Sequence, residues 1–315
     1  MKKKTVNAAG RKRPWLFILY MTVLVCFTAY VMLDTFVLPS VESSSASSAY
    51  ASENSKDQSS GSGSSESSDD SAVTTDTTYK DDNIQVTLTA KRVADTAVYI
   101  ADVKVSDVSY LKSALAQNSY GRNIKETTSS MASSNNAVLA INGDYYGFRD
   151  YGYVLRNGTL YRSEGGDSQD LVVNSDGSFS IINESETSAE SLEKAGALQV
   201  YSFGPALVNN SKILVSDSDE VAQSMNSNPR TAIGMVSPLH YVFVVSDGRT
   251  SESAGLSLKE LAQVMKDAGC TVAYNLDGGG SSTMYFNGQV VNNPTGGRGG
   301  NGSSEREVSD IIYIG

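Results

Sequence analysis

The chain has 315 residues, a formal net charge of −10, two cysteines and one histidine. The charge is uneven, because residues 1–14 contain six basic residues and no acidic one, which leaves a net charge near −16 on the remainder. A body this acidic does not attract a nucleic-acid backbone through its overall field. We therefore expect no nucleic-acid partner, and any phosphate-binding site must be local.

Cysteine and histidine usage excludes several kinds of site. Cys26 lies in an apolar run and Cys270 far downstream, so no disulfide framework is expected. A Cys/His zinc cluster and an HExxH motif are excluded as well. His240 lies in an apolar run typical of a buried strand, where we expect a structural role. The chemistry must then rest on carboxylates, arginines, hydroxyls and backbone amides.

The N-terminal region has the pattern of a membrane anchor. Residues 15–33 are nineteen uncharged residues, which as a helix would span about 28 Å, close to the ~30 Å of a bilayer core. The preceding basic residues predict a single-pass protein of the cell membrane, with a cytoplasmic N-terminus and an extracellular body. The alternative is a cleaved signal peptide, since Ala49-Tyr50-Ala51 resembles a cleavage site. The long apolar run and the distance to that site favour an uncleaved anchor.

A serine-rich segment follows the anchor. Residues 40–80 contain 16 serines and too few apolar residues to form a core, which predicts a disordered tether. The predicted organisation is a basic tail at 1–14, a transmembrane anchor at 15–38, a tether at 39–80 and a folded domain at 81–315.

Residues 81–315 predict a mixed α+β fold with a strand-rich sheet core and a few packed helices, because strands outnumber helices and few βαβ alternations occur. The clearest helix spans 258–268, where Ser257 and Glu260 form a capping box and Gly269 is the stop signal. Further helices are expected at 110–117 and 124–133. The strand-like runs are 84–89, 97–105, 137–142, 171–173, 179–182, 231–236, 241–246, 271–276 and 311–314.

The first segment that carries chemistry is residues 140–149. A buried strand runs into a turn where Asn142, Asp144 and Arg149 stand among the aromatic residues Tyr145, Tyr146 and Phe148. Aromatic faces beside carboxylates and amides suit sugar rings, whose C–H faces stack and whose hydroxyls need polar partners. The alternative is an Asn-Gly turn with aromatic residues that belong to the core.

The second segment is residues 228–234, in which Pro229 precedes Arg230 at the start of a strand. A guanidinium held at a rigid strand end suits bidentate binding of phosphate or carboxylate. The alternative is an ordinary surface ion pair.

The third segment, Asn275–Met284, follows a strand and contains Asp277, three glycines and two serines. The amides of Gly278, Gly279 and Gly280 suit an anion-binding nest, to which Ser281 and Ser282 add hydroxyl donors. The alternative is a flexible Gly-Ser turn. The loop is not a Walker motif, because neither a lysine nor a helix follows it.

Several features support a single cleft. Residues 140–144 and 273–277 both read A-x-N-x-D at a strand end, which suggests two adjacent strands with matched Asn/Asp pairs. The segment with Asp247 and Arg249 and the segment 202–207 are further supporting segments. The glycine-rich stretch 294–302 with Arg298, followed by Arg306, predicts a mobile flap that supplies a cation, unless the stretch is plain disorder.

Taken together and in this order, these segments resemble the phosphodiester glycosidase family, whose bacterial members are often described as exopolysaccharide biosynthesis proteins. The resemblance covers about residues 81–315 and is tightest over 137–315, with Asn228–Gly234, Asp247–Arg249 and Asn275–Ser282 as its hallmarks. Asn142–Tyr146 stands where the family pattern has an N-G-G-Y-F-type run, so Asp144 is an additional acid in this chain.

The resemblance implies hydrolysis of a sugar-1-phosphodiester of the GlcNAc-α-1-phosphate type in cell-surface or exopolysaccharide glycans. Asp277 and Asp144 are then the expected acid, base or nucleophile, and Arg230 the catalytic cation. No cofactor is required, although a divalent cation is compatible with the abundant oxygen ligands. The expected substrate-binding residues are Asn142, Tyr145, Arg149, Asp247, Arg249, Asn275, Gly278, Gly279, Gly280, Ser281, Ser282 and Arg306. Two other functions stay open: a glycosidase for ordinary glycosidic bonds, and a non-catalytic module for glycan binding or envelope assembly.

Overall fold

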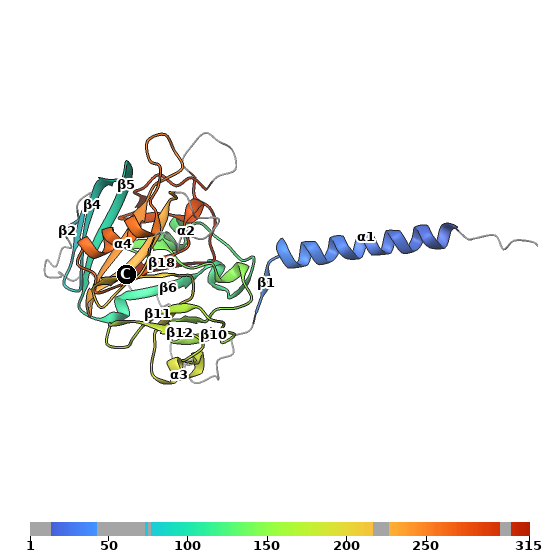
Figure 1. Cartoon of the computed structure of the whole chain (residues 1–315), viewed down its shortest axis with the longest axis horizontal. Helices are drawn as coiled ribbons and strands as arrows, with labels where there is room; N and C mark the ends of the chain where they lie inside the picture. The colour runs from blue at the N-terminus through green and yellow to red at the C-terminus, as the bar shows by residue number, and fades with distance from the viewer. Residues whose placement is uncertain (1–13, 43–72, 75–76, 217–226, 297–303) are drawn as a thin grey trace, which may run out of the picture. The chain divides into compact units, whose positions relative to one another are not determined.

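A computed structural model describes residues 14–42, 73–74, 77–216, 227–296 and 304–315 (Figure 1). The chain forms two compact units, Met1–Ser40 and Val41–Gly315. The first contains helix α1 (Pro14–Phe36), whose window Phe17–Asp34 has a mean hydropathy of 1.9. Its length and composition are sufficient to cross a membrane and suit an anchor and a secretion signal alike. The predicted basic tail and most of the predicted tether lie outside the described residues.

The second unit is built around three antiparallel sheets. The large sheet has the strand order β15 (Lys212–Ile213), β14 (Ala206–Asn209), β18 (Val272–Leu276), β16 (Arg230–Ser237), β17 (His240–Ser246), β5 (Thr96–Val105), β4 (Ile84–Val93), β3 (Thr78–Lys80) and β2 (Val73–Thr74). The second sheet has the order β20 (Gln289–Val290), β19 (Met284–Phe286), β8 (Leu139–Asn142), β21 (Asp310–Ile314) and β6 (Leu111–Leu115). The third has the order β10 (Thr159–Arg162), β9 (Val154–Arg156), β13 (Gln199–Tyr201), β11 (Gln169–Val173) and β12 (Phe179–Asn183). The remaining short strands are β1 (Ser40–Val41) and β7 (Gly121–Arg122).

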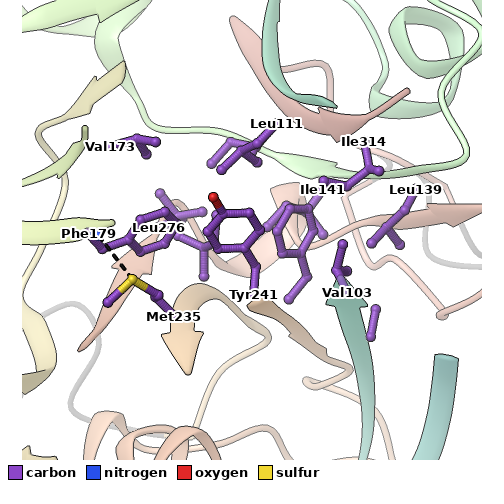
Figure 2. Packing of buried hydrophobic residues seen from close by; sticks show 14 of the residues in the cluster. Val103, Leu111, Leu139, Ile141, Val173, Phe179, Met235, Tyr241, Leu276 and Ile314 are labelled. Carbon is purple, nitrogen blue, oxygen red and sulfur yellow. Dashed lines mark hydrogen bonds between the residues drawn. The ribbon is translucent and has the colours of Figure 1, made fainter. Parts of the chain in front are cut away.

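The largest hydrophobic cluster lies between the three sheets, and Figure 2 shows part of it. Tyr241 and Leu276 come from the large sheet, Ile141 from the second and Phe179 from the third. The Phe179 amide donates to the Met235 Sδ atom at 3.1 Å across this core. Because side chains alternate along a strand, every second residue of a strand contributes to the common core.

The outer faces of the sheets carry the helices. Helix α4 (Leu258–Asp267) packs on the other face of the large sheet, and α2 (Thr128–Ser134) packs with outward residues of the second. Helix α3 (Ala189–Lys194) shares a cluster with outward residues of the third sheet. The predicted α+β class, with a strand-rich core and few packed helices, is therefore confirmed.

Most expected elements are present, although their ends differ by a few residues. The nine strand-like runs correspond to β4, β5, β8, β11, β12, β16, β17, β18 and β21. Helix α4 has the predicted capping box, because the Ser257 hydroxyl accepts from the Glu260 amide and the Glu260 carboxylate accepts from the Ser257 amide. Gly269, with φ +87°, follows the helix in the left-handed conformation that favours glycine.

Two helix predictions need correction. The helix predicted over 110–117 is wrong, because Leu111–Leu115 is strand β6, paired with β21 along its whole length. Leu111 enters the central core and Ala114 packs on the opposite side, so tertiary pairing overrides the local preference. The helix predicted over 124–133 begins at Thr128, because the Thr127 hydroxyl accepts from the Ser130 amide and caps it there.

Candidate active site

The ends of β8 and β18 meet at a junction between the large and second sheets. The Asn142 Nδ2 donates to the Asp277 carbonyl at 2.6 Å, and the Asp277 amide donates to the Gly143 carbonyl at 3.3 Å. The two A-x-N-x-D segments therefore meet, but as the ends of strands in different sheets and not as neighbours in one sheet. The junction places the Asp277 side chain beside two hollows.

Asn142 has a different position from the one predicted. It is completely buried, and its Oδ1 accepts from the Thr231 hydroxyl at 2.8 Å and the Thr283 amide at 3.3 Å. Every polar atom of its side chain is thus used to join strand ends. Asn142 therefore fixes the backbone of Asp277, and its predicted role in orienting a sugar stays a prediction.

Two hollows share Asp277 and Arg306 in their walls. The larger has a volume of about 640 Å³ and the smaller about 520 Å³. The larger hollow is lined by the polar residues Arg230, Arg249, Asn275, Asp277 and Arg306 and by the Phe203 ring, among others. The smaller hollow is lined by Lys125, Tyr145, Phe148, Asp277, Ser281 and Arg306, among others.

Asp277 is a largely buried carboxylate whose side chain is 11 % exposed. Its Oδ2 accepts from the Ser281 hydroxyl at 2.6 Å and from the Arg306 guanidinium at 2.7 Å. Burial raises the pKa of Asp277 and outweighs the opposing effect of Arg306 and Ser281, so the pKa lies above its ordinary value. A carboxyl group with a raised pKa at the wall of a cavity is suited to proton transfer.

Three arginines line the larger hollow from three separate segments. Arg230 begins β16, is buried, and donates from Nε to the Leu256 carbonyl at 2.9 Å. Arg249, at φ +61°, donates to the Asn228 Oδ1 at 3.0 and 3.1 Å. Arg306 completes the set. Three guanidinium groups around one cavity are suited to binding an anion, since arginine is the usual partner of phosphate and carboxylate groups.

The glycine-rich loop crosses from β18 in the large sheet to β19 in the second. A Cβ atom at Gly278 would lie 2.8 Å from the Pro229 carbonyl, and one at Gly280 would lie 2.8 Å from the Gly296 Cα. These close approaches require glycine. The amides of Gly279, Ser281 and Ser282 donate to carbonyls within the chain, and Gly279–Ser281 is a short 3-10 turn. Of the three amides predicted to form a nest, that of Gly279 therefore already has a carbonyl partner, and the nest itself stays a prediction.

Asp144 belongs to a buried ion cluster. Its side chain is fully buried, and its Oδ2 accepts from Arg156 at 2.9 Å while its Oδ1 accepts from the Tyr146 amide at 2.8 Å. Arg156 also pairs with Asp310 at 2.8 Å. Burial raises the pKa of both carboxyls. At Asp144 the positive charge of Arg156 helps to outweigh burial, and the pKa is lowered. At Asp310, which also faces the Asp144 carboxylate, burial outweighs the charge of Arg156, and the pKa stays raised. Asp144 also lines the smaller hollow, and its predicted role as a catalytic acid or nucleophile stays a prediction.

Three other predicted residues hold the walls of the site. The Asp247 Oδ1 accepts from the Asn293 amide at 2.8 Å, so Asp247 anchors that segment and lies outside both hollow linings. Ser282 is buried and also lies outside them. Arg149 donates to the Ser202 carbonyl and lies 5.8 Å from the centre of the Phe203 ring. The predicted contacts of these three residues with substrate stay predictions.

Tyr145 and Phe148 form an aromatic pair in the smaller hollow, with ring centres 4.7 Å apart and planes at 20°. Tyr145 was predicted to bind a sugar. It lines this hollow, and its role in binding a sugar ring stays a prediction. His240 is at the far end of β17 from Ser246 and contacts Asp102 at 2.8 Å, away from these hollows. Arg298 lies outside the described residues.

Sequence reasoning did not identify Arg156 and Asp310. Both are charged residues attached to apolar strand runs, Val154-Leu155-Arg156 and Asp310–Ile314. A charge within such a run costs free energy unless it is paired, so the pattern is a usable signal for a buried ion pair. The described residues contain no group of three or more His, Cys, Asp or Glu arranged to hold a metal ion.

The buried carboxyl of Asp170, which follows Gln169 of the larger hollow's lining in the chain, leads to a pH-dependent prediction. Burial and the neighbouring Glu184 raise the pKa of Asp170 to about 9 from an ordinary value of 3.8. The Asp170 carboxyl of the folded protein keeps its proton at pH values where the unfolded chain has already released it. The free energy of unfolding therefore falls as the pH rises from about 4 toward 9.

Asp170→Asn should therefore raise Tm by several degrees at pH 8 and by less at pH 5. Each kcal/mol is worth roughly 2–4 °C in a domain of this size. Thermal unfolding followed by circular dichroism measures this, and Asp176→Asn at an exposed turn is the control. An equal change at both pH values would show that Asp170 is already ionised.

Residues 135–315 match the phosphodiester glycosidase family. The match covers more than half of the chain and includes both hollows' principal polar residues, so the chain belongs to this family. The resemblance carried by residues 228–234, 247–249 and 275–282 is confirmed.

Two curated relatives match parts of the chain. The SPbeta prophage-derived uncharacterized protein YomE of Bacillus subtilis (strain 168) is 31% identical over 203 residues, which are 62% of this chain and 30% of YomE. The N-acetylglucosamine-1-phosphodiester alpha-N-acetylglucosaminidase of Mus musculus is 29% identical over 106 residues, 32% of this chain and 20% of the mouse protein. The chain thus spans under a third of the length of either relative.

Two solved structures share the fold. The zebrafish N-acetylglucosamine-1-phosphodiester alpha-N-acetylglucosaminidase catalytic domain, auto-inhibited by its pro-peptide, has a TM-score of 0.59 and 21% identity, covering 73% of this chain and 82% of that chain. A protein from Synechocystis has a TM-score of 0.57 and 14% identity, covering 74% and 62%. At these identities the likeness concerns the fold alone.

Proposed function

We propose that this protein hydrolyses a sugar-1-phosphodiester, releasing the sugar and a phosphomonoester. The observation that carries the proposal is the position of Asp277, which lies in the wall between an arginine-lined hollow and an aromatic-lined one. A phosphodiester bound by Arg230, Arg249 and Arg306 would place its glycosyl ring near Tyr145 and Phe148. The anomeric carbon would then lie close to the Asp277 carboxyl.

The chemistry suits these groups. Cleavage at an anomeric carbon develops positive charge on the sugar, which a carboxylate stabilises, and negative charge on the departing phosphate, which guanidinium groups stabilise. Because a phosphomonoester is already a good leaving group, a second carboxylic acid is less necessary than in ordinary glycosidases. This agrees with the finding that the Asp144 carboxylate is committed to Arg156.

We also propose that the site faces the cell exterior. The support is α1, which is apolar enough to span a bilayer, together with the basic residues that precede it in the sequence. A sugar-1-phosphate linkage in a surface or extracellular polysaccharide is then the proposed substrate. Protease treatment of intact cells tests this topology. The protease should cleave the folded domain outside the cell and leave the N-terminal tail protected.

The function is tested with two substrates that share an N-acetylglucosamine-α-1 group, one a methyl phosphodiester and the other the methyl glycoside without phosphate. The full chain in detergent micelles should release sugar from the phosphodiester and leave the glycoside intact. Cleavage of the glycoside at an equal rate would instead support an ordinary glycosidase. Binding without cleavage of either substrate would support a glycan-binding module.

Arg230→Ala distinguishes the two enzymatic functions. We expect kcat/KM for the phosphodiester to fall by about 10²–10³-fold, the usual effect of losing one preorganised electrostatic group. The surface variant Arg122→Ala, which removes an exposed pair with Asp150, should leave the rate unchanged. Normal phosphodiester turnover by Arg230→Ala would show that this arginine does not bind the phosphate.

A further inference from the structure

One guanidinium serves both hollows. Arg306 donates from Nη2 to the Asp277 Oδ2 at 2.7 Å and to the Gly278 carbonyl at 3.2 Å, and from Nε to the Ser281 hydroxyl at 2.7 Å. Its side chain is 43 % exposed, whereas the Asp277 side chain is only 11 % exposed. A half-exposed arginine side chain can reorient toward a ligand without disturbing the core that holds Asp277.

The surroundings of Asp277 make Arg306 its essential counterion. Among the described residues, the ion pair of Asp277 is with Arg306, and its side chain also accepts from the Ser281 hydroxyl and from the Gly278 backbone. Arg230 and Arg249 line the larger hollow, and Lys125, Glu305 and Glu307 line the smaller one. Asp144 also borders the smaller hollow, but its carboxylate is directed to Arg156.

We infer that a bound phosphodiester takes Arg306 over from Asp277, and that Asp277 then accepts a proton from solvent. Substrate binding would thereby load the acid that the reaction uses. This inference rests on the proposed function, and it assigns Asp277 the role of proton donor and Arg306 the role of a counterion shared between carboxylate and substrate.

The physical reason is competition between two anions for one cation in a largely buried site. When the guanidinium turns to the phosphate, the Asp277 carboxylate is left beside a second negative charge at low effective dielectric. A phosphodiester is too acidic to take up a proton near neutral pH, so the carboxyl takes it. Burial, which raises the pKa of Asp277, acts in the same direction.

The proton balance of the reaction closes. Asp277 gains one proton from solvent on binding and gives it to the phosphate oxygen that leaves the anomeric carbon. Water then adds its oxygen to that carbon, and its released proton passes to Asp277 and leaves to solvent when the products dissociate and Arg306 pairs with Asp277 again. One water is consumed, and the products are a free sugar and a phosphomonoester.

Dimethyl phosphate is a suitable probe, because it is an anion throughout the working pH range and has no glycosidic bond to cleave. We would measure its binding to the full chain in detergent by titration calorimetry at about pH 6.5, in buffers of different ionisation enthalpy, which gives the number of protons taken up. The wild type should take up a substantial fraction of one proton per anion bound. Glu186→Gln, at an exposed site, should behave identically.

Two variants should abolish this proton uptake with opposite effects on affinity. Asp277→Asn should bind the probe about tenfold more tightly or better, because Arg306 no longer has a competing carboxylate. Arg306→Gln should bind it about tenfold more weakly, because one charge-assisted contact is lost. Absence of proton uptake by the wild type, or weaker binding by Asp277→Asn, would overturn the inference. So would failure of the wild type to bind the probe.

The result is separable from the proposed function. Proton-linked binding without cleavage of any glycosyl phosphodiester would refute hydrolysis but support the exchange of Arg306. Cleavage of the phosphodiester with no proton uptake would support the hydrolase and refute the exchange.

Discussion

Replacing Asp277 with asparagine is expected to lower kcat for phosphodiester hydrolysis by about 10²–10³-fold or more, the scale on which single preorganised catalytic groups act. The substitution keeps the size of the side chain and an oxygen that can accept from Arg306 and Ser281. It removes the ability to exchange a proton and to carry negative charge beside the anomeric carbon. Initial rates of sugar release, measured with saturating substrate, give the effect directly.

The matched control is Asp82→Asn, which makes the same chemical change at an exposed position outside the sheets. It should leave kcat and Tm unchanged. For Asp277→Asn, Tm should also stay close to that of the wild type, since the cost of burying this carboxylate is removed along with its ion pair. Wild-type kcat in a correctly folded Asp277→Asn protein would remove Asp277 from the mechanism.

The class of fold could be predicted from the sequence. Its strand-forming segments either alternate apolar and polar residues or are continuously apolar, and helix α4 has both a capping box and a stop signal. Helix 110–117 was predicted wrongly because β6 depends on pairing with β21, almost 200 residues later in the chain. Local pattern contains no information about such a partner. The same limit applies to Val154–Arg156 and Met284–Phe286, short strands whose identity depends on their neighbours.

The candidate site was predictable in part for a similar reason. Asp277, Arg230 and Arg306 could be selected because their residue types suit phosphate chemistry and they follow or precede strand runs. The partner of a side chain was not predictable, since the amide of Asn142 and the carboxylate of Asp144 have residue types that suit a reaction but are held by buried hydrogen bonds. Their hydrogen bonds to Thr231, Thr283 and Arg156 are formed across sheets and leave no local signature.

The buried residues behind the site determine how rigidly Asp277 is held. Arg156 is 2 % exposed and lies 4.3 Å from the centre of the Tyr201 ring, while its guanidinium bonds to Asp144 and Asp310. The Gly143 amide donates to the Asp310 carbonyl, and the Gly143 carbonyl accepts from Asp277. A chain of short contacts therefore leads from the ion cluster to the backbone of Asp277, and we expect damage to the cluster to reduce both stability and turnover.

Arg156→Met is accordingly expected to destabilise the folded body by about 3–5 kcal/mol near neutral pH, because it leaves two buried carboxylates without their cation. In a domain of this size that corresponds to a fall in Tm of roughly 6–20 °C. Chemical denaturation followed by near-ultraviolet circular dichroism of the tyrosines gives the free energy of unfolding.

The pH dependence of this loss identifies its cause. Without Arg156 the two buried carboxyls, Asp144 and Asp310, favour their protonated forms in the folded state, so their pKa values exceed those of the unfolded chain. The stability lost at pH 7 should then be recovered progressively as the pH falls toward about 4, where the unfolded chain also holds these protons. The triple variant Arg156→Met, Asp144→Asn, Asp310→Asn is the control, and its stability should vary less with pH. A deficit for Arg156→Met that is the same at pH 5 and pH 8 would instead attribute the loss to packing around Tyr201, and the ion cluster would no longer account for the rigidity of the site.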